Sequence, residues 1–182
     1  LRAGSGNAAV QGIAEADDGT LLFATSLGVM RLQGPKLEPA MLDGERTCAL
    51  LRDGAALWVG QTGQLTRVDA GGITRFNLPA QGKNACVSKL TRTGAGLWLG
   101  TTAGLFRLNA ETIEPSGLDP QVDRLPTESL SHDSADNLWI GTAPTLYRLR
   151  PNGQLERIGE DDFVRDSWIL AAYEDREGNL WL

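Results

Sequence analysis

The only histidine of the sequence stands in the run Ser131-His132-Asp133, which has the residue types of a nucleophile, a general base and an orienting carboxylate. A catalytic triad requires these three groups to meet in space. The run ends an expected strand, where neighbouring side chains point to opposite faces. We therefore expect His132 to stabilise a turn and not to take part in catalysis.

Basic side chains recur where we expect loops between repeated units. Arg46, Arg124 and Arg165 occupy nearly matching places, and Lys83 stands in a fourth such loop. Cations that converge in this way suit a carboxylated or sulfated ligand, which they would bind through charge-assisted hydrogen bonds. Solvated loop charges are the alternative interpretation. The candidate ligand-binding residues are Arg46, Asn84, Arg124, Arg165, Asp166 and Trp168.

Trp168 is the one tryptophan outside the repeated phrase described below. It either closes over a ligand or covers the core of the last unit.

The two cysteines, Cys48 and Cys86, are about one repeat apart and so occupy similar places in adjacent units. We favour buried free thiols, and a disulfide between the units is the alternative. Two cysteines without a nearby histidine do not form a metal site, and we expect no metal and no cofactor.

These residues are positioned by a phrase that recurs about every 40 residues. Its copies are Leu21-Leu22-Phe23-Ala24, Leu57-Trp58-Val59-Gly60, Leu97-Trp98-Leu99-Gly100, Leu138-Trp139-Ile140-Gly141 and Leu180-Trp181-Leu182. We expect Trp58, Trp98, Trp139 and Trp181 to pack between neighbouring units, and the glycine to let the next backbone approach closely. The arginines nine residues after the first four of these positions, interpreted as solvated or locally paired charges, are Arg31, Arg67, Arg107 and Arg148.

One unit shows the pattern of strands. Cys86–Thr91, Leu97–Thr101 and Leu105–Asn109 read as strands separated by glycine-containing turns. Thr112–Ser116 is a weaker strand, and Pro115 suits only an outer edge. Four strands in about 40 residues are typical of a β-propeller blade. We predict an all-β protein with four four-stranded antiparallel blades and the start of a fifth, in one domain over residues 1–182. The blades lie at about 8–43, 44–80, 81–121, 122–162 and, incomplete, 163–182.

The composition narrows the range of functions. The 182 residues carry a net charge of −6, and Lys and Arg are not clustered. We therefore expect no binding to nucleic acid, which needs phosphate-neutralising cations. No apolar run approaches the ~20 residues of a membrane span. The sequence begins without Met and stops within a repeat, so we expect it to be a piece of a longer protein.

Three segments resemble the repeat of the two-component regulator propeller family, namely Gly96–Leu108, Asp136–Thr142 and Glu174–Leu182. The typical phrase of that family is D-x-x-G-x-L-W-I-G-T-x-x-G-L-x-R. The second unit departs from it with Gln61 in place of Thr, and the fourth has Pro144-Thr145 where glycine is usual. The resemblance implies a seven-bladed ring of which this chain forms a part.

The resemblance also implies a function. Members of the family are sensor regions of bacterial hybrid histidine kinases or diguanylate cyclases, usually outside the cytoplasmic membrane. We therefore expect a periplasmic or extracellular ligand-sensing propeller that binds a small molecule or glycan, is not an enzyme, and meets the membrane only through a segment outside this chain. An open blade edge predicts either self-association or a ring of which part is missing from this sequence. The alternatives are a propeller enzyme of the streptogramin-lyase type, disfavoured by the single histidine, and a protein–protein interaction scaffold.

Overall fold

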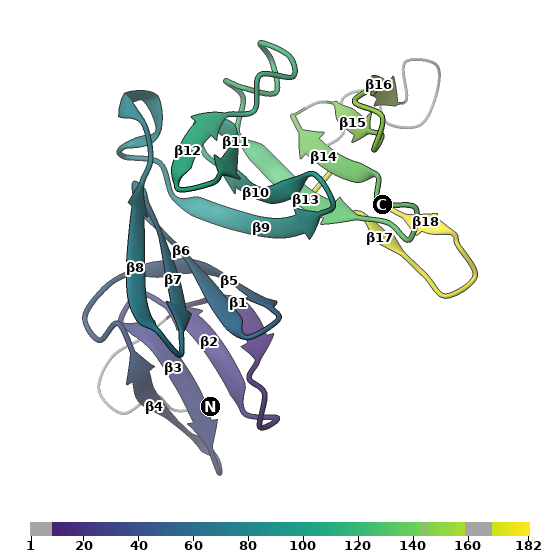
Figure 1. The fold of residues 1–182 in the computed structure, drawn as a ribbon. Coiled ribbons are helices and arrows are strands. Elements are labelled where there is room, and N and C mark those ends of the chain that lie inside the picture. The colour runs from purple at the N-terminus through teal and green to yellow at the C-terminus, as the bar shows by residue number, and fades with distance from the viewer. Residues whose placement is uncertain (1–8, 144, 159–168) are drawn as a thin grey trace.

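The computed structural model describes residues 9–143, 145–158 and 169–182 (Figure 1). It contains four four-stranded antiparallel sheets and a smaller two-stranded one. In each sheet the strands pair in chain order, so every connection is a hairpin. We call each four-stranded sheet a blade and number the blades along the chain.

The strands have the following bounds. Blade 1 contains β1 (Val10–Glu15), β2 (Leu21–Thr25), β3 (Gly28–Gln33) and β4 (Lys36–Met41). Blade 2 contains β5 (Thr47–Asp53), β6 (Ala56–Gln61), β7 (Gln64–Asp69) and β8 (Gly72–Asn77), and a single 3-10 turn, η1 (Ala80–Gly82), follows it. Blade 3 contains β9 (Val87–Thr93), β10 (Gly96–Thr101), β11 (Gly104–Asn109) and β12 (Thr112–Pro115). Blade 4 contains β13 (Thr127–His132), β14 (Leu138–Thr142), β15 (Leu146–Leu149) and β16 (Leu155–Ile158). The two-stranded sheet pairs β17 (Tyr173–Glu174) with β18 (Leu180–Trp181).

The first strands of successive blades lie side by side. β1 contacts β5, β5 contacts β9, and β9 contacts β13. The blades follow one another along an arc, with the two-stranded sheet after blade 4 (Figure 1). This is the arrangement of β-propeller blades. It confirms the predicted all-β class, the four four-stranded antiparallel sheets and a smaller fifth sheet. Pro115 lies on the outer strand of its blade, as the sequence predicted.

The repeated tryptophans fill the interfaces between blades. Trp58 packs against blade 3, in a cluster with Leu97 and Phe106. Trp98 packs likewise against Leu138 of blade 4, and Trp139 against the segment that precedes β17. These three predictions are confirmed. Trp181, on β18, is 64% exposed and no described sheet lies against it, so its packing between neighbouring units stays a prediction.

The glycine of the phrase gives the neighbouring blade room. A Cβ atom on Gly60 would lie 2.2 Å from the carbonyl oxygen of Val87 on the next inner strand. A Cβ on Gly141 would lie 2.7 Å from the carbonyl oxygen of Ile169. Real Cβ atoms do not approach an oxygen so closely, so the phrase requires glycine at these positions.

The repeated arginines stack on the tryptophans. Hairpin register places Arg67 opposite Trp58, and the same pairing recurs in blades 3 and 4. The guanidinium carbon lies 6.0 Å from the ring centroid of Trp58, and 5.5 Å separates Arg107 from Trp98. These are cation–π distances. Arg67 also pairs with Asp69, so local pairing was predicted correctly and the stacking was not.

The other edge of each tryptophan is held by the turn between the first two strands. The indole nitrogen of Trp139 donates to Asp133 at 2.8 Å, and that of Trp98 donates to Thr93 at 3.0 Å. Trp181 and Asn179 donate to Asp175, and these hydrogen bonds lower the pKa of Asp175 to about 2. Burial acts to raise the pKa of Asp133, but hydrogen bonds from Asn137 and Trp139 outweigh it and hold that pKa below its ordinary value.

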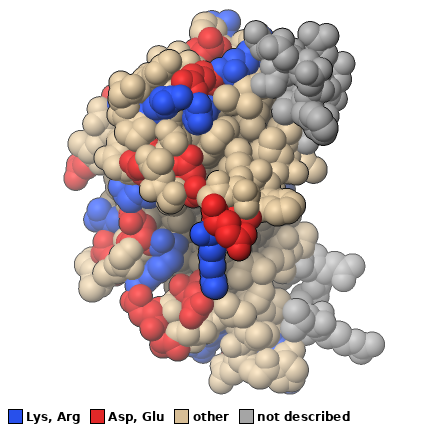
Figure 2. Space-filling model, turned by 90° about the vertical axis from the view of Figure 1, so that its right-hand side faces the viewer, with Lys and Arg blue, Asp and Glu red and all other residues tan. Residues whose placement is uncertain are grey.

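Charges are mixed on the surface. On the face shown in Figure 2, acidic and basic side chains are interspersed and form no extended patch of one sign. Two ion pairs join neighbouring blades: Arg52 pairs with Asp17, and Arg92 pairs with Asp53. Exposed ion pairs of this kind contribute little to stability individually, so the apolar interfaces provide most of the cohesion.

Candidate ligand-binding site

Two sets of loops meet at one end of the blades, which we call the loop face. One set comprises the turns between second and third strands, and the other comprises the linkers between blades. The amide of Gly63 donates to the carbonyl of Ala85 at 2.8 Å, and the amide of Leu105 donates to that of Val122 at 3.0 Å. Each of these bonds joins a turn to the following linker. Function in repeat folds concentrates on such loops, because a rigid scaffold holds them.

A polar cavity of about 510 Å³ opens on the loop face of blade 2. We call it the blade 2 pocket. It lies between the segment that leads into β5, the β6–β7 turn, the end of β8 and the linker after η1. Its lining residues are Glu45, Arg46, Gln61, Thr62, Gly63, Gln64, Asn77, Leu78 and Lys83. The structure thus brings two of the predicted loop cations, Arg46 and Lys83, into one cavity.

A hydrogen-bond network forms one wall of the blade 2 pocket. The buried Gln61 donates from its Nε2 to Glu45 at 2.8 Å, and its Oε1 accepts from Thr66 at 2.6 Å. The other carboxylate oxygen of Glu45 pairs with Arg75 at 2.7 Å. Because Arg75 offsets the charge of Glu45, the uncompensated charge of the pocket comes from Arg46 and Lys83.

The side chains of Arg46 and Lys83 are exposed. Within the described part of the chain, neither forms an ion pair. Gln64 and Asn77 lie across the same pocket and are joined by a hydrogen bond of 3.2 Å from Gln64 Nε2 to Asn77 Oδ1. The pocket therefore combines two cations with neutral donors and acceptors.

The pocket forms where the sequence of blade 2 departs from the repeat. In blades 1 and 3 the hydroxyls of Thr25 and Thr101 donate across the turn, at 2.8 Å, to the carbonyls of Gly28 and Gly104. Blade 2 has Gln61 instead, whose longer side chain reaches Glu45. Its turn is made by Gly63, at a φ of 68° that favours glycine.

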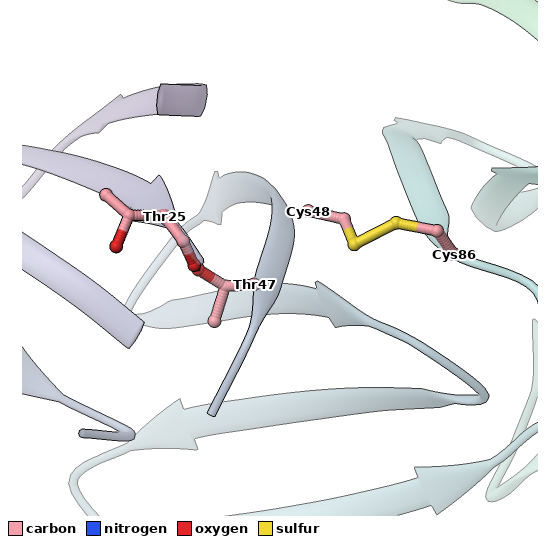
Figure 3. The surroundings of a disulfide bond; sticks show 4 residues. All are labelled: Thr25, Thr47, Cys48 and Cys86. Atoms are coloured by element: carbon pink, nitrogen blue, oxygen red, sulfur yellow. A yellow bond between two sulfur atoms is a disulfide. The ribbon is translucent and has the colours of Figure 1, made fainter. Parts of the chain in front are cut away.

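Cys48 and Cys86 form a disulfide that joins blade 2 to blade 3 (Figure 3). Their Cα atoms are 6.4 Å apart, within the usual range. The favoured prediction of free thiols is therefore wrong, and the alternative is right. Cys48 is the extra residue of a β-bulge next to Thr47, whereas Cys86 precedes β9 and bridges to Thr62. The two cysteines are thus offset by two positions, not equivalent as their spacing suggested.

The remaining candidates are dispersed. Arg124 lines a second cavity of about 480 Å³ beside Asp123 and Gln81, between blade 3 and the linkers that precede and follow it. Asn84 is exposed in the linker next to Lys83 and does not line the blade 2 pocket. Arg165, Asp166 and Trp168 lie outside the described residues. The structure thus groups Arg46 with Lys83 and places Arg124 in a separate cavity.

A third cavity, of about 440 Å³, lies at the linker from blade 3 to blade 4. It is lined by Asp119, Gln121, Tyr147 and Arg157 among others. The phenol of Tyr147 lies 2.9 Å from Gln121 Oε1 and donates to it. Burial raises the pKa of Tyr147, so this phenol stays protonated near neutral pH and serves as a hydrogen-bond donor.

His132 has a structural position. Its Nδ1 lies 3.0 Å from the hydroxyl of Thr91 on the neighbouring inner strand, so it links blade 4 to blade 3. The carboxylate of Asp133 is occupied by Asn137 and Trp139. In the described ranges, no three His, Cys, Asp or Glu side chains come together in a way that could hold a metal ion.

Sequence reasoning missed three contributors to the blade 2 pocket: Gln64, Asn77 and the Glu45–Arg75 pair. Gln61, the departure from the repeat phrase, was a usable signal for the place of the pocket. No comparable signal marked Asn77, because the end of an outer strand carries no repeated residue type.

No protein-family model matches the sequence, and no curated protein matches it significantly. Solved structures show the fold. Two structures of the extracellular domain of BT4673 from B. thetaiotaomicron, described as a one component system and as a hybrid two component system, match 94% of the chain at 21% and 20% identity with TM-scores of 0.73 and 0.71. The chain spans about a quarter of the length of these proteins, since 25% of each is covered.

Virginiamycin B lyase from Staphylococcus aureus is a second kind of match. The structure of its catalytically inactive variant with quinupristin matches this chain at 14% identity and a TM-score of 0.75. The match covers 96% of this chain and 62% of the lyase. At these identities the likeness establishes the fold alone. The predicted resemblance to two-component sensor regions is confirmed at that level. Over the part of the chain that the structure describes, no helix has the length and hydrophobicity of a membrane span.

Proposed function

We propose that this chain is the ligand-sensing part of a bacterial signal-transduction protein, that it lies outside the cytoplasmic membrane, and that it binds without catalysis. The observation that carries the proposal is the blade 2 pocket, a polar cavity on a face built from loops, with two cations that form no ion pair with any described residue. The fold of the extracellular domain of BT4673 supports the assignment to signalling.

The disulfide supports the proposed location. Disulfides persist in oxidising compartments and are rare in a reducing cytosol. The bond between Cys48 and Cys86 joins two blades next to the pocket, so an oxidising compartment would favour the folded form of this site. Trapping of free thiols in cells that express the full-length protein should find both cysteines oxidised. Reduced cysteines in the native host would contradict the extracytoplasmic location.

Two further proposals concern assembly. The blades would form part of a seven-bladed ring, because four similar blades already follow a curved path in which inner strands adjoin inner strands (Figure 1).

The second proposal is self-association of the chain, since Tyr173, Trp181 and Leu182 are exposed on and beside the two-stranded sheet. Sedimentation velocity should show a mass that rises with concentration, and a constant monomer mass would contradict it.

A lyase of the streptogramin type is the second candidate function, because the fold matches virginiamycin B lyase at a TM-score of 0.75. Such an enzyme would need an acid–base group at a site open to its substrate. His132 hydrogen-bonds to Thr91 and lies at the end of β13, away from the β6–β7 turn that lines the blade 2 pocket. These contacts favour the binding function.

One experiment separates the two candidates. The purified protein is screened by thermal shift against a panel of organic acids, amino acids, sugars and oligosaccharides. Incubation with quinupristin and Mg²⁺, followed by chromatography, runs in parallel. A sensor should show a rise in Tm with at least one compound and leave quinupristin intact. Conversion of quinupristin, or no thermal shift with any class of compound, would contradict the proposed function.

A further inference from the structure

We infer that the blade 2 pocket binds a small polyhydroxylated carboxylate, with Arg46 and Lys83 holding the carboxylate and the Gln64–Asn77 amide pair holding hydroxyl groups. The inference rests on the proposed function and specifies its ligand class. It concerns one cavity on one blade rather than a ring of cations around a central axis.

The charge of the pocket selects an anion. Glu45 is the one acidic residue that lines the pocket, and Arg75 and Gln61 occupy its two carboxylate oxygens. Arg46 and Lys83 carry two positive charges that no described acidic group offsets. A carboxylate placed between them would accept charge-assisted hydrogen bonds, which are about twice as strong as neutral ones.

The neutral part of the lining selects hydroxyl groups. The bond from Gln64 to Asn77 uses one donor and one acceptor. Among the described residues, the Oε1 of Gln64 and the Nδ2 of Asn77 have no other hydrogen bond, so they can accept from and donate to a ligand. Thr62 adds an exposed hydroxyl at the β6–β7 turn. A ligand hydroxyl both donates and accepts, so it can satisfy an amide pair that an apolar ligand would leave unsatisfied.

The disulfide anchors the two backbone segments that carry the cations. Arg46 stands two residues before Cys48, and Lys83 stands three residues before Cys86, so both cation-bearing segments end at the same covalent bridge. The amide of Gly63 also bonds to Ala85 of the second segment at 2.8 Å. A Cβ on Gly63 would meet the carbonyl oxygen of Lys83 at 2.1 Å, so the turn and the linker are tightly packed. A site that is organised before binding loses less entropy when the ligand enters.

The chemistry excludes a polyanion. Two cations on a chain of net charge −6 cannot neutralise a run of phosphates. The cavity of about 510 Å³ falls in the range of small-molecule pockets. The ligand is therefore a single small anion.

The test uses isothermal titration calorimetry with three probes. D-Gluconate has both a carboxylate and hydroxyls, sorbitol has the same hydroxyl chain without the carboxylate, and acetate has the carboxylate alone. We expect gluconate to bind at least about tenfold more tightly than either of the others, since each missing set of bonds removes a charge-assisted or an amide contact. Equal binding of gluconate and sorbitol, or no binding of gluconate, would overturn the inference.

Matched substitutions locate the site. Arg46→Gln and Lys83→Gln should each weaken gluconate binding about tenfold or more. Arg31→Gln and Lys36→Gln, at exposed positions of blade 1, carry the same charge change and should leave it unaltered. An unchanged Tm confirms that each variant is folded.

The outcomes also separate this inference from the proposed function. If the thermal-shift screen finds a ligand whose affinity is unchanged by Arg46→Gln and Lys83→Gln, the proposed sensor function stands and the proposed blade 2 site is wrong. If no compound of any class binds, the proposed function itself fails.

Discussion

Removal of the disulfide should lower the free energy of unfolding by several kcal/mol. The bond closes a loop of 38 residues between Cys48 and Cys86. Cross-linking a loop of this length removes chain entropy from the unfolded state equivalent to about 4 kcal/mol at 25 °C. Native packing is little affected by the change to alanine, since each residue loses one sulfur atom. We therefore expect the double variant Cys48→Ala/Cys86→Ala to be less stable by about 2–4 kcal/mol.

Urea unfolding followed by tryptophan fluorescence measures this change. Trp58, Trp98 and Trp139 are at least 93% buried, so their emission reports loss of the blade interfaces. A phosphine reductant should lower the midpoint for the wild-type protein to that of the double variant and should leave the variant unchanged. A difference below about 1 kcal/mol, or a response of the double variant to reductant, would refute the reasoning, because a bridge across this loop must restrict the unfolded chain.

Three other perturbations test the blade interfaces. Gly60→Ala should lower the free energy of unfolding in urea by about 1–3 kcal/mol, because its Cβ would lie 2.2 Å from the Val87 carbonyl oxygen. The control Gly71→Ala, whose Cβ would meet only the flexible Asp69 carboxylate, should leave that free energy nearly unchanged. Equal effects of the two substitutions would contradict the close packing at Gly60. Trp98→Phe should lower the free energy of unfolding by about 2 kcal/mol, because the smaller ring loses the Thr93 hydrogen bond, stacks less strongly on Arg107 and leaves space in the interface. The same change at the exposed Trp181 should have a far smaller effect. The reverse order would be evidence against the packing role. The folded-state pKa of Asp133 lies below its ordinary value of 3.8, so its carboxylate stabilises the fold above that pH, and the contribution disappears as pH falls through the folded pKa. In thermal melts, Asp133→Asn should therefore lose less Tm on acidification than the wild type. Identical acid profiles of the two proteins would refute this.

The fold could be predicted from the sequence because its signal is repeated. The Leu-Trp-x-Gly phrase marks a strand, an interface side chain and a close backbone approach in each copy, and Trp58 and Gly60 occupy those roles in the structure. The stacking of Arg67 on Trp58 could have been deduced as well, since residues nine apart face each other across a hairpin. An arginine in a strand pattern gives no sign by itself of whether it is solvated or stacked, and only the hairpin register distinguishes the two.

The pairing of Cys48 with Cys86 could not be predicted from the sequence. A β-bulge at Cys48 and a bridge before β9 at Cys86 shift the two side chains toward each other, and neither irregularity leaves a residue signature. The pocket was predictable in part. Arg46 and Lys83 were candidates, but the sequence did not show that they line one cavity with Gln61 and Asn77 while Arg124 lines another.

Hydrogen–deuterium exchange can show whether the loop face of blade 2 binds the ligand. The protein is compared with and without the compound that gives the largest thermal shift. We expect slower exchange in residues 45–46, 61–64 and 77–86, which contain the lining of the blade 2 pocket. Protection confined to the opposite turns, such as 53–56 and 133–137, would contradict it.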